Sequence, residues 1–117
     1  MKKPLNSVRI ECMLEAATRI AQRMPGVSLP EFLASEDLQD IALHRLLVIG
    51  KAGVSVLNDA PQYLPQLNRA AIGRMRKFVL PNYAEVELKE VWKSVVADVP
   101  ALLTELPPII AQLKTDE

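Results

Sequence analysis

The segment from Leu38 to Leu57 sets the strongest limit on the fold of this chain. Its apolar residues recur every three to four positions and cover most sides of a helix. A helix of this kind lies at the centre of a domain or at a subunit interface, because few of its sides tolerate water. Arg45 falls inside the apolar stripe, so its guanidinium must be paired or must leave the core along its stem. The segment predicts the central helix of an all-α domain.

Start and stop signals place shorter helices on either side of this segment. Asn6 or Ser7 is suited to cap a first helix, which the Pro25-Gly26 pair ends. Ser28 and Glu31 have the capping-box spacing and open a short second helix. After a proline-bearing loop, a fourth helix is expected from about Asn68 to Val79, ahead of Pro81, and a fifth from Val86 onward.

The C-terminal quarter carries two further interruptions. Asp98-Val99-Pro100 suggests a new cap and a kink, and Pro107-Pro108 is expected to close the domain. The tail 107–117 then either adds a last helical turn or frays. The chain has no strand alternation, no hairpin dipeptide and no internal repeat. We therefore expect one domain over residues 1–117, an all-α antiparallel bundle of four to five helices.

The charge balance restricts contacts with nucleic acids. The chain has 14 basic and 14 acidic residues, so it lacks the basic excess of a protein that relies on phosphate contacts throughout. One basic cluster stands out, formed by Arg69, Arg74, Arg76 and Lys77. The cluster is either a solvated face or a local phosphate-binding patch.

The sequence predicts neither a zinc site nor a signal peptide. Its one cysteine, Cys12, and its one histidine, His44, are too few for a zinc site. Cys12 lies in a helical apolar pattern and is expected to be a packed thiol; His44 is expected to be a structural or surface residue. No segment resembles a signal peptide or a membrane span, so we expect a cytoplasmic protein with no membrane association.

The order of short motifs resembles the HepT-like group of HEPN domains. The resemblance extends from about Ser7 to Leu106. It depends on FLAS-x-x-x-QD, R-L-x-V-I-G, an M-R pair followed by a tyrosine, and L-x-x-V-W in that order. It implies a HEPN-like helical bundle, a homodimer and a role beside a minimal nucleotidyltransferase, as the toxin component of a toxin–antitoxin pair. It implies no cofactor.

The family's motif is R-x4-H-x-Y, and this chain keeps only its two ends. The family arginine corresponds to Arg76 and the tyrosine to Tyr83, but the histidine position holds Pro81. Lys77 stands where the family commonly has asparagine, and Lys51 where it often has glutamate. In the family the matching tyrosine receives AMP from the partner enzyme, so Tyr83 is either a modification site or an ordinary core-edge tyrosine.

Active members of the family are similar to metal-independent ribonucleases. Histidine is suited to the proton transfers and arginine to the phosphate, whereas Pro81 has no proton to exchange. The favoured hypothesis is therefore a degenerate nuclease that binds a nucleotidyltransferase, or binds RNA weakly, through Arg76 and its neighbours. The alternatives are an active ribonuclease that uses Arg76 with another acid–base group, and a helical interaction module with no RNA role.

Overall fold

The computed structural model describes residues 5–78 and 87–117, and within these ranges every regular element is helical. The prediction of an all-α bundle is confirmed. The helices are α1 (Asn6–Arg23), α2 (Leu29–Ala34), α3 (Glu36–Asp59), the 3₁₀ turn η1 (Pro61–Tyr63), α4 (Gln66–Arg76), α5 (Leu88–Lys93), the π-helical turn η3 (Ser94–Asp98) and α6 (Val99–Asp116).

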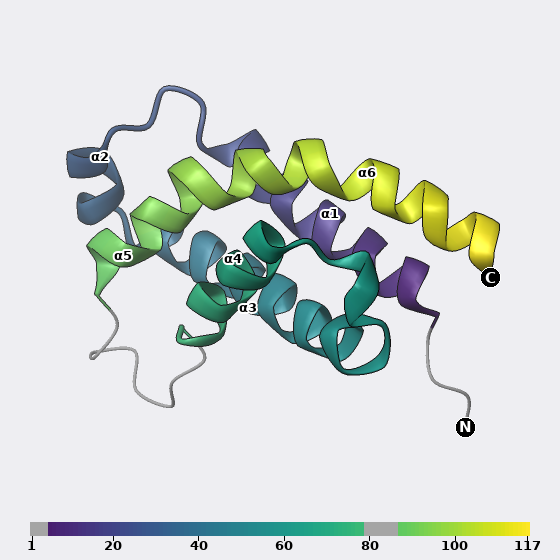
Figure 1. Cartoon of the computed structure of the whole chain (residues 1–117). Coiled ribbons are helices and arrows are strands. Elements are labelled where there is room, and N and C mark those ends of the chain that lie inside the picture. Colours follow the sequence, from purple (N-terminus) through teal and green to yellow (C-terminus); the bar gives the residue numbers. More distant parts are fainter. Residues whose placement is uncertain (1–4, 79–86) are drawn as a thin grey trace.

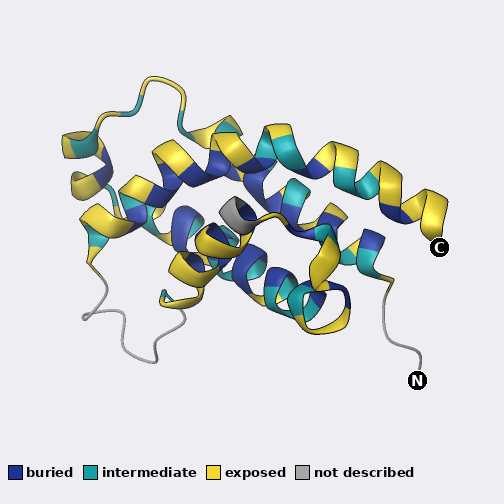
Figure 2. Ribbon diagram, viewed as in Figure 1, coloured by how far each residue is buried: buried dark blue, intermediate teal, exposed yellow. Residues whose placement is uncertain are grey.

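α1 is the centre of the packing. It lies against α3 on one side and α6 on the other, and α4 packs on α3 (Figure 1). The buried residues of these helices face one another and form one aliphatic core (Figure 2). At one end α2 packs on α5, where the rings of Phe32 and Trp92 lie 5.1 Å apart between centroids. The central place expected for the long segment is thus shared between α3 and α1.

Local capping follows the sequence at α2 and α3. The Ser28 hydroxyl accepts a hydrogen bond from the Glu31 amide at 3.3 Å, and the Glu31 carboxylate accepts one from the Ser28 amide at 3.3 Å. The Ser35 hydroxyl accepts from the Leu38 amide at 3.2 Å, which caps α3. Gly26 has a φ of +74°, a conformation that glycine adopts without strain, and it turns the chain between α1 and α2.

The expectations for α1 were wrong in two details. Its cap position is Leu5, which makes no side-chain capping bond, so neither Asn6 nor Ser7 caps the helix. Cys12 is exposed rather than packed, because the neighbouring Met13 takes the inward position. The inward face of α1 consists of Ser7, Ile10, Met13, Ala16, Ala17 and Ile20.

Two glycines of α3 face α4, and one of them, Gly53, lets the two helices approach closely. A Cβ atom on Gly53 would lie 2.7 Å from the Cδ1 and Cγ1 atoms of Ile72, which is closer than real contacts allow. A Cβ atom on Gly50 would lie 3.4 Å from the backbone nitrogen of Arg76. Gly53 is therefore the position that requires a glycine for α4 to pack on α3, whereas a Cβ atom at position 50 would make an ordinary contact with Arg76.

The C-terminal helix is longer than expected. Asp98 makes no capping bond for α6, and a π-helical turn replaces the expected new cap. Pro107 and Pro108 do not end α6, which continues to Asp116. Both prolines are exposed, so the carbonyl groups that lose their helical partners on that side can bond to water.

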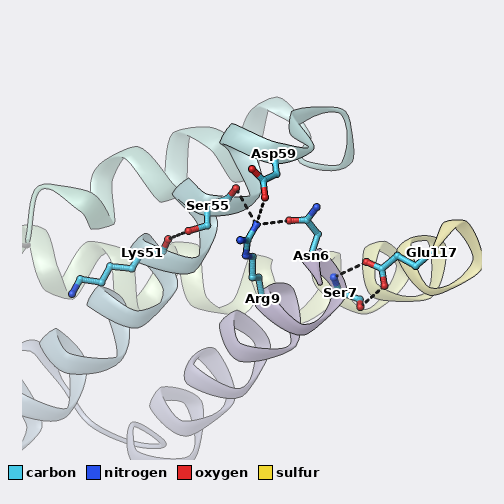
Figure 3. A network of polar contacts seen from close by, with 7 residues as sticks. All are labelled: Asn6, Ser7, Arg9, Lys51, Ser55, Asp59 and Glu117. Carbon is cyan, nitrogen blue, oxygen red and sulfur yellow. Dashed lines mark hydrogen bonds and ion pairs between the residues drawn. The ribbon is translucent and has the colours of Figure 1, made fainter. Parts of the chain in front are cut away.

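The last residues of α6 are tied to the rest of the bundle. The Glu117 carboxylate accepts hydrogen bonds from the Ser7 amide at 3.1 Å and from the Ser7 hydroxyl at 2.7 Å (Figure 3). The Tyr63 hydroxyl donates to Asp116 at 2.5 Å, and Leu113 is buried in the core. These contacts hold the tail as an ordered helix against α1 and η1.

Among the described residues, α5, η3 and α6 follow one another without a break as the helical stretch Leu88–Asp116, which by length and composition alone could cross a membrane. It has 29 residues and a window of mean hydropathy 1.4, of which 33% is buried inside the protein. The core helix of a globular bundle meets the same criteria, and Val91, Val99 and Leu102 of this helix belong to the core. We assign the helix to the bundle; the absence of a membrane association stays a prediction.

Candidate nucleic-acid interface

An open groove lies between the second half of α3 and the end of α4. Its volume is about 580 Å³, and it is lined by Gly50, Lys51, Val54, Ser55 and Arg76. The backbone of Arg76 packs on Gly50 of α3, so Arg76 lies beside the groove. The groove thus combines two cationic side chains from helices that are remote in sequence.

Both cations of this groove lack partners in the part of the chain that the structure describes. Neither the Arg76 guanidinium nor the Lys51 ammonium group makes a hydrogen bond or ion pair there, and both residues are exposed. Arg76 is the last residue of α4, where the helix dipole favours a positive charge. A guanidinium binds two phosphate oxygens at once, and an ammonium adds a point charge beside it. The arrangement is suited to hold a phosphate.

Arg9 lies near the same groove but is already engaged. Its Nη1 atom donates to Asp59 Oδ2 at 2.5 Å, to Asn6 Oδ1 at 2.9 Å and to the Ser55 carbonyl at 3.5 Å (Figure 3). The side chain of Arg9 is only 14% exposed. These bonds join the start of α1 to the end of α3 beside Ser55, which lines the groove. The carboxylate of Asp59 balances the positive charge of Arg9.

Ser55 lines the groove one turn beyond Lys51. Its hydroxyl donates to the Lys51 carbonyl at 3.3 Å within α3 (Figure 3). Its proton is therefore committed to the helix backbone, and its oxygen remains able to accept a bond. Ser55 can contact the hydroxyl of a ligand but lacks a base that would activate it as a nucleophile among the described residues lining this groove.

The other basic residues of the predicted cluster lie outside the groove. Arg69 donates to the carbonyls of Pro61 at 2.6 Å and Leu64 at 2.9 Å, which fastens the loop ahead of α4. Lys77 is exposed just beyond the helix. Among the four residues of the predicted cluster, Arg69, Arg74, Arg76 and Lys77, only Arg76 lines the described groove.

Arg74 of α4 forms a two-point ion pair with Asp98. Its Nη2 atom donates to Asp98 Oδ1 at 2.6 Å and its Nε atom to Asp98 Oδ2 at 3.1 Å. These hydrogen bonds raise the pKa of the Arg74 guanidinium above its ordinary value. The pair joins α4 to the π-helical turn, so Arg74 has a structural role whether or not it also meets RNA.

Comparison with known proteins adds the family. A model described as ribonuclease HepT-like matches residues 13–109. The chain belongs to the ribonuclease HepT-like family. A curated relative, the probable ribonuclease HepT of Thermococcus cleftensis, is 27% identical over 93 residues, which cover 80% of this chain and 84% of that protein. No solved structure matches the chain significantly.

In this HepT-like chain, two residues assigned to the family motif, Pro81 and Tyr83, lie outside the described residues. Their assignment, like the RNA-binding assignment of the basic cluster, stays a prediction. His44 is exposed on α3 and does not line the Arg76 groove. It therefore does not replace a missing histidine beside Arg76 in the described surface.

Sequence reasoning did not assign Lys51 and Ser55 to the site. Lys51 appeared only as a departure from the family glutamate. Gly53, two residues after Lys51, was a usable signal, because a glycine inside a helix can have a packing reason such as the approach of a second helix. Within the described residues, no three His, Cys, Asp or Glu side chains lie close enough together to hold a metal ion.

Proposed function

We propose that this HepT-like protein binds RNA through the groove of Lys51 and Arg76 and cleaves it weakly or not at all. The observation that carries the proposal is the pair of cations, exposed beside one groove and unpaired within the described residues. Internal folding does not account for their position, because neither makes an internal ion pair there. A phosphate supplies the missing negative charge.

The proposed loss of cleavage follows from the chemistry of the side chain at position 81. Cleavage beside a 2′-hydroxyl needs one group to remove its proton and another to protonate the leaving oxygen. Histidine performs both tasks near neutral pH, and proline performs neither. Loss of one such group lowers the rate by about 10²- to 10⁴-fold. Arg76 still stabilises charge on the phosphate, which supports binding without efficient cleavage.

The setting that we propose is that of the family. The protein forms a homodimer and pairs with a minimal nucleotidyltransferase antitoxin in the cytoplasm, with Tyr83 as the residue that accepts AMP. Support for this setting is the family membership of the chain and the tyrosine two positions after Pro81. Light scattering of the purified protein tests the dimer, and mass spectrometry after co-expression with the partner enzyme tests the modification of Tyr83.

Cleavage of RNA in the presence of a metal chelator tests the main proposal. We expect no cleavage by the native protein, cleavage by Pro81→His, and none by Pro81→His combined with Arg76→Ala. Pro81→Ala is the matched control, because it removes the proline ring without adding an imidazole. Efficient cleavage by the native protein that disappears in Arg76→Ala would show that another side chain performs the proton transfers, and would refute the proposal.

A further inference from the structure

A second concavity lies between the end of α1 and the first half of α3. Its volume is about 400 Å³. The lining residues are Arg19, Gln22, Arg23, Asp40, Ile41, His44 and Arg45. Three of them are arginines, yet they occur in two segments about twenty residues apart, so no basic cluster is visible in the sequence. We call this site the α1–α3 concavity.

Positive charge in the α1–α3 concavity is only partly balanced. Arg23 and Arg45 make no hydrogen bond or ion pair with any described residue. Arg19 lies 3.7 Å from Glu15, and both side chains are more than half exposed, at 55% and 65%. Because this ion pair is long and exposed, Arg19 can readily exchange Glu15 for another anion. The only carboxylate lining the concavity is that of Asp40, which is itself unpaired among the described residues.

The chemistry of the lining fits a phosphate. Guanidinium groups bind two oxygens of a phosphate side by side, and the Gln22 amide and the His44 ring add further hydrogen-bonding groups. Arg45 is half-buried, so its stem packs along the protein while its guanidinium reaches the concavity. This resolves the apparent cost of an arginine in the apolar stripe of α3.

His44 of the α1–α3 concavity lies on the same side of α3 as Lys51 and Ser55 of the groove, whereas Arg45 lies about 100° further round the helix. Lys51 follows His44 by seven residues, and Ser55 follows Lys51 by four, spacings that return to the same side of a helix. The distance along the helix axis from His44 to Lys51 is about 10 Å, at 1.5 Å per residue. One extended strand that passes His44 and Lys51 therefore reaches both sites.

We propose that the α1–α3 concavity is a second phosphate-binding site, which holds a backbone phosphate of the RNA strand whose neighbouring segment lies in the Lys51–Arg76 groove. The proposal rests on the proposed RNA-binding function. It assigns Arg23 and Arg45 as the main ligands, with Arg19 as a third cation once Glu15 releases it. Asp40 opposes the phosphate and limits the affinity.

Fluorescence anisotropy with a labelled oligouridylate, titrated at several salt concentrations, tests this site. Each phosphate contact to single-stranded RNA contributes about 0.7 to the slope of log affinity against log salt. We expect Arg23→Gln/Arg45→Gln, which removes both main ligands of one phosphate, to weaken binding and to reduce the slope by about 0.7. Asp40→Asn, which changes shape little, is expected to tighten binding. Arg23→Lys/Arg45→Lys keeps the charge and is expected to keep most of the slope.

The control is Lys93→Gln/Lys114→Gln, which changes the net charge equally at two exposed residues that line neither site. Its slope should match that of the native protein. Thermal unfolding followed by circular dichroism verifies that each variant is folded. If the control lowers affinity as much as Arg23→Gln/Arg45→Gln does, only net charge matters and the proposed site is wrong.

Comparison with Lys51→Gln/Arg76→Gln separates the two proposals. Weaker binding by both double variants supports both sites. Native binding by Arg23→Gln/Arg45→Gln, with weaker binding by Lys51→Gln/Arg76→Gln, refutes the second site alone, and the reverse result refutes the groove alone. An acidic protein partner is the competing occupant: a polyglutamate peptide that binds the native protein more tightly than the RNA, and loses that affinity in Arg23→Gln/Arg45→Gln, would refute the assignment to RNA.

Discussion

Replacement of Gly53 by alanine adds a methyl group at the point where α3 and α4 are closest. The new Cβ atom would lie 2.7 Å from two carbons of Ile72 and 3.1 Å from a third. Ile72 is 1% exposed, so its side chain has no open space into which it can turn. Overpacking of this kind costs about 1 to 3 kcal/mol, while alanine returns up to about 1 kcal/mol of helix propensity. We expect a net loss of about 1 kcal/mol in the free energy of unfolding.

Gly73→Ala is the matched control for this change. Gly73 is an exposed residue inside α4, and a Cβ atom there would meet no atom within 4 Å. The same substitution should therefore stabilise the protein by up to about 1 kcal/mol. Both variants replace a helical glycine by alanine, but only Gly53→Ala creates a steric clash. The difference between their free energies of unfolding therefore isolates the contact between position 53 and Ile72.

Thermal and urea unfolding, followed by circular dichroism, measure both variants. At about 4 °C in Tm for each kcal/mol, Gly53→Ala should melt below the native protein and Gly73→Ala above it. Gly53→Ala should also weaken RNA binding, because a displaced Ile72 shifts α4 and Arg76 with it. If Gly53→Ala is as stable as Gly73→Ala, then α3 and α4 do not approach as described, and the placement of Arg76 beside Lys51 loses its support.

Two further predictions concern polar contacts that join distant segments. Arg74→Met leaves the carboxylate of Asp98, which is only 9% exposed, without its partner, so we expect urea unfolding to show a loss of about 1 to 2 kcal/mol in the free energy of unfolding. Adding Asp98→Asn should recover part of this loss. An unchanged stability of Arg74→Met would contradict the pairing. The hydrogen bond from Tyr63 lowers the pKa of Asp116 below its ordinary 3.8. This bond therefore stabilises the folded protein fully above pH 3.8, and the stabilisation is lost as the pH falls through the lowered pKa that Asp116 has in the folded state. NMR titration should find the Asp116 pKa lowered in the native protein and returned toward 3.8 in Tyr63→Phe, and equal values in the two proteins would show that the bond does not form.

Local signals in the sequence predicted the helices well where a single segment decides the outcome. The capping box of Ser28 and Glu31 and the stop at Pro25-Gly26 act within a few residues, so sequence is sufficient. The stop assigned to Pro107 was wrong because helix continuation there depends on exposure and on tertiary contacts of the tail. Proline removes a backbone bond, but the buried Leu113 and the bond from Tyr63 to Asp116 favour the helix beyond it.

The candidate site was less predictable than the fold. Arg76 was found because a family motif marks it, whereas Lys51 reaches the same groove only through the packing of α4 on α3. Arg23 and Arg45 likewise meet only after α1 folds against α3. Sequence proximity gave a cluster of four basic residues, of which Arg69 and Arg74 make internal bonds. Proximity along a chain does not indicate which charges a fold leaves unpaired.

The pairing of each arginine separates the roles that folding explains from those that it does not. Arg9, Arg69 and Arg74 each bond to oxygens of a distant segment or a neighbouring loop, and their positions follow from the stability of the bundle. Arg76 and the arginines of the α1–α3 concavity gain no comparable contact within the described residues, and like charges placed near one another repel. A polyanion removes that repulsion at both sites. The unpaired cations that α1, α3 and α4 bring to the two sites, rather than the total charge of the chain, are therefore the basis of the proposed RNA-binding surface.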